Sequence, residues 1–180
     1  MSWTLKQAPS QAGRTAVVTG ANIGLGYETA LALAAKGCTV VLACRNPAKA
    51  EAAKAAILAL HPKARVECQV LDLASLASIR AFAAACRKRH ATLDLLINNA
   101  GIMMPPYALS EDGFESQLAA NYLGHFALTG LLLPLIVKTQ NSRIVTLSSL
   151  AHKWSGIRFH DLHATRRYDK RLAYGQSKLA

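Results

Sequence analysis

The stretch that decides the fold is Thr15-Ala-Val-Val-Thr-Gly-Ala-Asn-Ile-Gly-Leu-Gly26. A short β-branched run is followed directly by glycines at positions 20, 24 and 26. Because glycine permits tight turns and close approach of the backbone to a phosphate, we predict a strand, a glycine-rich turn, and a helix running from near Gly24 to about Lys36. The spacing G-x-x-x-G-x-G differs from the G-x-G-x-x-G fingerprint. Its place between strand and helix still indicates a dinucleotide site rather than a merely structural turn.

The same alternation of short apolar runs and longer Ala-rich segments continues along the chain. Strands are predicted over residues 15–19, 39–43, 65–71, 93–97 and 143–147. Further helices are predicted from the Asn46-Pro47 pair to about Leu60, from a Ser75 cap to about His90, and from Asp112 or Gly113 onward. Continuously apolar strand cores are typical of parallel strands covered on both faces. The pattern predicts one domain over residues 1–180, a doubly wound parallel sheet of the Rossmann-like α/β/α type.

Length and composition are consistent with one α/β domain. The 180 residues are 52% hydrophobic, and the four cysteines form no C-x-x-C pair, so we expect free thiols in a reducing compartment. The polar start, residues 1–13, does not resemble a secretory signal, and we predict a cytoplasmic protein. The uncharged window 116–137 contains Asn121, His125 and Pro134, so we predict a buried core helix rather than a transmembrane segment.

The net charge of +11 raises the question of nucleic-acid binding. Much of the excess lies between Lys153 and Lys178, where Asp161, Asp169 and apolar residues interrupt the basic ones. No continuous basic stripe results. The sequence therefore predicts no nucleic-acid partner.

The end of the second strand indicates which dinucleotide is bound. NAD-binding units carry an acidic residue about 20 positions after the glycine loop, where it binds the ribose hydroxyl. Here the strand ends in Cys44-Arg45, directly before the Asn46-Pro47 helix start. A cation beside a helix N-terminus is disfavoured unless an anion lies between them. Although a solvated surface Arg45 is the alternative, the sequence favours NADP over NAD.

Four motifs occur in the order expected for one enzyme family: T-G-A-N-I-G-L-G at 19–26, D-L at 72–73, N-N-A-G at 98–101 and Y-G-Q-S-K at 174–178. With them the chain resembles the short-chain dehydrogenase/reductase family. The further strings A-C-R-N at 43–46, D-G-F-E at 112–115, N-Y-L-G-H-F at 121–126, S-S-L-A-H at 148–152 and F-H-D-L at 159–162 look like its retinol dehydrogenase-like branch.

The resemblance implies hydride transfer between NADP(H) and an alcohol or carbonyl, with an apolar substrate in this branch. Met103, Met104, Trp154 and Phe159 are candidates for an apolar pocket wall. Two alternatives stay open: a protochlorophyllide reductase-like enzyme, which shares many of the strings, and a catalytically inactive NADP-binding or regulatory protein. The full-length protein could form a homo-oligomer.

The resemblance also implies the catalytic residues. Tyr174 would exchange a proton with the substrate oxygen, and Lys178, four residues later on the same helix face, would favour the phenolate and hold the nicotinamide ribose. Ser149 is preferred to Ser148 as the hydroxyl that binds the reacting oxygen; neighbours on an extended strand point to opposite faces. Asn121 would complete a proton relay through water to Lys178, or would simply be a satisfied buried amide.

The cofactor is expected to lie along the ends of the first four strands, with Asp72 and Leu73 beside the adenine and Asn99 to Gly101 along its approach. The predicted cofactor-binding residues are Gly20, Asn22, Ile23, Gly24, Gly26, Arg45, Asp72, Leu73, Asn99, Ala100, Gly101, Tyr174 and Lys178. His125, His152 and His160 match no common zinc spacing, and no metal is predicted. Because the later turns and the next parallel strand are missing, we expect the 180-residue chain to be unstable and inactive by itself.

Overall fold

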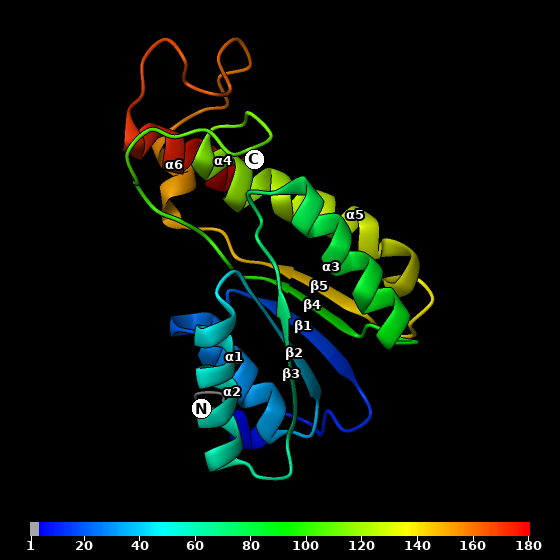
Figure 1. Cartoon of the computed structure of the whole chain (residues 1–180). Helices are drawn as coiled ribbons and strands as arrows, with labels where there is room; N and C mark the ends of the chain where they lie inside the picture. The colour runs from blue at the N-terminus through cyan, green and yellow to red at the C-terminus, as the bar shows by residue number, and fades with distance from the viewer. Residues whose placement is uncertain (1–3) are drawn as a thin grey trace.

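A single parallel sheet organises the computed structural model, which describes residues 4–180 (Figure 1). Its strands are β1 (Thr15–Thr19), β2 (Thr39–Cys44), β3 (Arg65–Val70), β4 (Leu95–Asn98) and β5 (Arg143–Thr146). They lie in the order β3-β2-β1-β4-β5, and every neighbouring pair is parallel. The order reverses between β1 and β4, which confirms the predicted doubly wound α/β sheet and places the switch point beside the glycine loop.

Helices cover both faces of the sheet (Figure 1). The helices α1 (Gly24–Ala35) and α2 (Pro47–Leu60) lie on one face, and α3 (Leu76–Arg89) and α5 (Gly124–Ile136) on the other. Strand β1 contributes to both cores, since Val17 belongs to one buried cluster and Ala16 and Val18 to the other. This alternation is the two-residue period of a strand. The helix α6 (Lys170–Leu179) lies beyond the carboxyl ends of the strands, next to α4 (Ser116–Leu118) (Figure 1).

Local signals explain most of the boundaries. Asn46 and Ser75 accept hydrogen bonds from the backbone N–H groups of Lys49 and Ser78, so both predicted caps are confirmed. Short 3₁₀ turns occupy η1 (Leu5–Gln7) and η3 (Leu150–Trp154). The cysteines are free, with three buried and Cys68 partly buried.

The long apolar helix differs from its prediction. It begins at Ser116 instead of Asp112 or Gly113, because Gly113 lies in a turn with φ +81° and the Glu115 carboxylate accepts the N–H groups of Gln117 and Leu118. The segment η2 (Ala119–Leu123) is a π-helical turn that connects α4 to α5. Insertions of this kind occur frequently at functional sites.

The same helical segment has the length and apolar composition of a membrane span. Within the described residues, only Ser116–Ile136 is long and apolar enough to cross a bilayer by length and composition, and 44% of the window tested is buried inside the protein. The core helices of soluble proteins meet the same criteria. Leu128 and Leu132 belong to the buried cluster of the sheet, so this face of the helix is part of the core.

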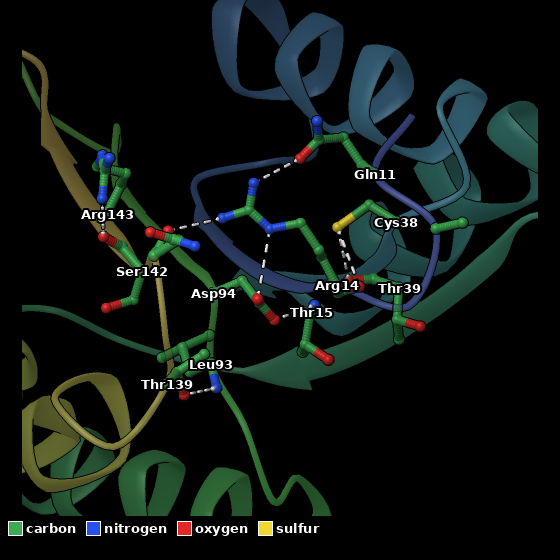
Figure 2. A network of polar contacts seen from close by, with 12 residues as sticks. Gln11, Arg14, Thr15, Cys38, Thr39, Leu93, Asp94, Thr139, Ser142 and Arg143 are labelled. Atoms are coloured by element: carbon green, nitrogen blue, oxygen red, sulfur yellow. Dashed lines mark hydrogen bonds and ion pairs between the residues drawn. The ribbon is translucent and has the colours of Figure 1, made fainter. Parts of the chain in front are cut away.

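A polar network holds the amino ends of the central strands together (Figure 2). The Asp94 carboxylate accepts the Thr15 N–H at 2.8 Å and the Arg14 Nε at 3.3 Å, and the Arg14 guanidinium reaches the Asn141 carbonyl at 3.1 Å. Thr139 Oγ1 accepts the Leu93 N–H at 3.1 Å. The Leu93 N–H is thus bonded to a side chain instead of a neighbouring strand, and β4 begins at Leu95, two residues after its predicted start.

Candidate active site

A cavity of about 390 Å³ lies at the carboxyl ends of the strands, next to the switch point. It brings together most of the predicted cofactor residues: Gly20, Asn22, Ile23, Gly26, Arg45, Asp72, Leu73, Asn99, Ala100 and Gly101. Gly24, Tyr174 and Lys178 are outside this lining. The residues of the glycine loop and of three later strand ends therefore surround one space.

Two glycines of the loop are required by close contacts. Gly20 has φ +65°, and a Cβ there would lie 3.0 Å from the Cα and Cβ of Ala100. A Cβ at Gly26 would collide with the Gly20 carbonyl and the Asn99 amide nitrogen. The glycines let the loop, the start of α1 and the end of β4 approach one another, which keeps the cavity open to a ligand.

Two side chains of opposite charge, Arg45 and Asp72, line this cavity. Arg45, exposed, follows β2 directly, and Asn46 then caps α2. Asp72, half-buried, accepts the Ala74 N–H at 2.9 Å through one carboxylate oxygen. A guanidinium is therefore placed at the strand end where NAD-binding units carry a carboxylate.

The loop after β4 is fastened to β1 through Thr19. The Asn99 side chain donates to the Thr19 carbonyl at 2.8 Å. The Thr19 hydroxyl accepts the backbone N–H groups of Asn99 and Ala100, both at 2.9 Å. These bonds fix the backbone that leads to Gly101, beside which the Asn121 and Lys178 side chains lie.

Asn121 and Lys178 meet at Gly101. A Cβ on Gly101 would lie 3.2 Å from Asn121 Oδ1 and 3.4 Å from Lys178 Nζ. The Asn121 amide donates to the Ile102 carbonyl and to Ser177 Oγ, each at 2.9 Å, and accepts the Ile102 N–H at 2.8 Å. Both amide hydrogens are thus used. A water relay from Asn121 would have to use one of its oxygen lone pairs.

The predicted Tyr174–Lys178 pair lies on α6. Lys178 Nζ donates to the Leu147 carbonyl at 3.2 Å, and burial lowers the pKa of its ammonium. Tyr174 is half-buried, and its ring centroid is 6.3 Å from that of Trp154. One helix therefore presents the phenol beside an apolar side chain and the ammonium toward Gly101.

The two serines do different things. Ser149 accepts the Ala151 N–H at 3.2 Å and caps η3, whereas Ser148 Oγ donates to the Lys178 carbonyl at 3.0 Å. Ser148 also lines a second cavity, of about 480 Å³, with Asn121 and Lys178. Within residues 4–180 neither serine is hydrogen-bonded to Tyr174. The preference for Ser149 stays a prediction.

Several polar residues near the site were missed by the sequence reasoning. Thr19, Ser177 and His125 lie within the quoted motifs, but the sequence assigns none of them a role in the site. All three make buried hydrogen bonds to the residues described above. The signal for His125 was its position four residues after Asn121, which places both side chains on one helix face.

Comparison with known proteins identifies the family that the sequence motifs indicate. A family model described as short chain dehydrogenase matches residues 14–161. The chain belongs to this family. It is 50% identical to human retinol dehydrogenase 13 over 176 residues, which are 96% of this chain and 53% of that protein. It is 44% identical over 174 residues to the chloroplastic short-chain dehydrogenase TIC 32 B of Brassica napus, covering 92% of this chain and 54% of that one. The resemblance to the retinol dehydrogenase-like branch is confirmed.

Solved structures agree on the fold. A protein from Mycobacterium paratuberculosis is 49% identical, with a TM-score of 0.87 over 99% of this chain and 62% of that one. A short chain dehydrogenase from Shigella flexneri, solved in complex with NADP, is 26% identical with a TM-score of 0.74 over 94% of this chain and 67% of that one. The chain spans about half the length of the curated relatives it matches.

Proposed function

We propose that this domain binds NADP(H) and transfers a hydride between it and an apolar alcohol or carbonyl compound. The observation that carries the proposal is the cavity at the switch point, which is lined by the glycine loop, Arg45 and Gly101. Gly101 in turn lies against the Asn121 and Lys178 side chains. A Cβ at Gly24, the first residue of α1, would meet nothing within 4 Å, so the start of the helix is open to the close approach of a pyrophosphate to backbone N–H groups. The NADP complex of the Shigella flexneri relative supports the same cofactor.

The residues of the chain would divide the chemistry among them. The bound nicotinamide supplies or accepts the hydride. Tyr174 gives a proton to the carbonyl oxygen or takes one from the alcohol, and Lys178 stabilises its phenolate. Ser149, or Ser148 in its place, donates a hydrogen bond to the reacting oxygen. Asn121 holds the Ile102 backbone and α6 together, which keeps these groups in place.

The retinol dehydrogenase relatives and the exposure of the candidate wall residues support an apolar substrate. Trp154 packs on Tyr174 and is 48% exposed, Phe159 is 80% exposed, and Met103 is 58% exposed. Ligand sites are typically lined by apolar and aromatic groups with a few polar ones. A retinoid-like aldehyde is therefore the first compound to test.

The test is turnover of NADPH with a panel of apolar aldehydes and ketones, comparing the wild-type full-length protein with its Tyr174→Phe variant. The substitution removes the transferable proton and keeps the ring, so we expect kcat to fall by about 10² to 10⁴-fold while the Kd for NADPH stays unchanged. A near-normal kcat in the variant would assign the acid to another residue. NADPH binding without turnover of any compound would favour an inactive, regulatory protein. Turnover of protochlorophyllide alone would favour a protochlorophyllide reductase-like enzyme.

A further inference from the structure

His125 is a buried polar residue that has no part in the proposed chemistry. It lies on the first turn of α5 and is only 5% exposed. Its Nδ1 is 3.1 Å from the main-chain carbonyl of Asn121, and its Nε2 is 2.9 Å from Thr19 Oγ1. Both ring nitrogens are therefore hydrogen-bonded, Nδ1 to Asn121 in η2 and Nε2 to Thr19 at the end of β1.

The partners decide where the proton of the ring lies. A carbonyl oxygen can only accept, so Nδ1 of His125 must be the donor to Asn121. Burial lowers the pKa of the imidazole to about 4, and the ring is neutral at pH 7. The Nε2 atom is then an acceptor. The hydroxyl proton of Thr19 must consequently point to His125.

This assignment fixes the direction of the Thr19 hydroxyl. With its proton given to His125, both of its lone pairs are free to accept the N–H groups of Asn99 and Ala100. One unbroken series of hydrogen bonds thus runs from these two amides through Thr19 and His125 to the carbonyl of Asn121. On its other side, the Asn121 side chain binds both backbone groups of Ile102. The loop 99–102 is held at its start and at its end by one helical segment.

We propose that His125 is a positioning residue, which sets the place of the 99–102 loop relative to Asn121 and Lys178. Gly101 lies in the middle of this loop, against Asn121 Oδ1 and Lys178 Nζ. A shift of the loop would therefore move the wall of the cavity where the nicotinamide is proposed to bind. This role rests on the proposed function. A misplacement of about 1 Å in such a site can lower the rate about 10²-fold.

Two substitutions each keep one half of the imidazole's bonding. In His125→Asn the amide nitrogen can replace Nδ1 and bind the Asn121 carbonyl, and in His125→Gln the amide oxygen can replace Nε2 and accept from Thr19. His125→Phe keeps the ring and loses both bonds, and the Thr19 proton is then left to turn to the Ile97 carbonyl, 3.4 Å away. His90→Phe is the matched control, because His90 is a largely buried histidine whose partner, Glu67, is remote from the cavity.

The measurements are kcat, KM and the Kd for NADPH in the full-length protein that carries each substitution. We expect kcat to fall about 30 to 100-fold in His125→Phe, with KM and Kd changing less than about threefold. In the Asn or Gln variant, which keeps one of the two bonds, kcat should fall only about 5 to 10-fold. His90→Phe should keep the wild-type kcat. A His125→Phe protein that is folded and has a kcat within threefold of wild type would overturn the proposal.

Two readouts on the wild-type chain do not depend on turnover or on the folding of a variant. Nitrogen-15 NMR should show a neutral His125 ring protonated at Nδ1, and the Ala100 amide should exchange slowly with solvent. A ring protonated at Nε2, or a fast-exchanging Ala100 amide, would refute the positioning role even in an active enzyme. If the chain turned over no substrate, these two results would still decide the role of His125, while the proposed function would fail separately.

Discussion

Arg45 is the single residue on which the choice of cofactor depends. It is exposed beside the cavity, where it can pair with a 2'-phosphate as a charged hydrogen-bond donor. We expect Arg45→Ala to weaken NADPH binding by about 1.5 to 3 kcal/mol, roughly 10 to 150-fold in Kd, and to leave NADH binding unchanged. Lys63→Ala removes the same charge at the opposite end of α2 and is the control. Fluorescence titration with both cofactors is the measurement, and equal losses for NADPH and NADH would contradict the assignment.

Asp94 is the residue whose removal should cost most stability at the amino ends of the strands. The Asp94 carboxylate is 12% exposed and accepts hydrogen bonds from Thr15 and Arg14 (Figure 2). An asparagine side chain at this position has only one oxygen, so its NH₂ group would face one of these two donors. We expect Asp94→Asn to lower the free energy of unfolding by about 2 to 3 kcal/mol. Glu51→Gln, in the exposed pair with Lys54, should change it by less than about 1 kcal/mol. Urea denaturation followed by circular dichroism compares the two, and similar losses in both would show that the network adds little.

The sequence predicted the residues that line the cavity better than the bonds that hold it. Gly20, Arg45 and Asn99 follow strands, and the ends of parallel strands meet at one edge, so their proximity could be derived from the pattern. Thr19 binds the His125 side chain and the backbone N–H groups of Asn99 and Ala100, and no spacing in the sequence specifies these partners from other elements. The choice between Ser148 and Ser149 depends on how the backbone leaves β5, which the alternation of a regular strand does not determine.

At the scale of elements, α5 contains two glycines in opposite surroundings. A Cβ at Gly124 would collide with the Leu73 carbonyl, whereas one at Gly130 would meet nothing within 4 Å. Gly130→Ala should therefore stabilise the chain by about 0.5 to 1 kcal/mol through helix propensity. Gly124→Ala should instead destabilise it by about 1 to 3 kcal/mol, since the helix must move away from the end of β3. Thermal unfolding of the two variants is the measurement, and a shift of the same sign in both would contradict the close contact.

The elements themselves were largely predictable, and the exceptions have local causes. Apolar runs, caps and prolines determined α2, α3 and the strands to within about two residues. The long helix begins later than predicted because Glu115 accepts its first N–H groups, and glutamate is an uncommon cap. The π-helical turn at Ala119–Leu123 has no signature in residue type, since it differs from an α-helix only in which carbonyl each N–H binds.

At the scale of the whole molecule, β5 is the exposed edge of the sheet. All four of its residues are exposed, with Ile144 at 41% and Val145 at 45%, and its only strand partner in the described chain is β4. An apolar strand with free backbone groups can pair with another chain. We therefore expect the 180-residue chain to self-associate in solution, and we expect Val145→Lys to suppress this association because a charge on an edge strand opposes pairing. Val70→Lys is the control, since it adds the same charge to the other edge strand, β3, whose middle residues are buried or partly buried. Light scattering over a range of concentrations gives the assembly size, and hydrogen exchange at residues 143–146 reports the pairing. A monomeric wild-type chain with slow exchange in β5 would mean that the edge is stable when exposed, and the expected instability of this 180-residue unit would then be wrong.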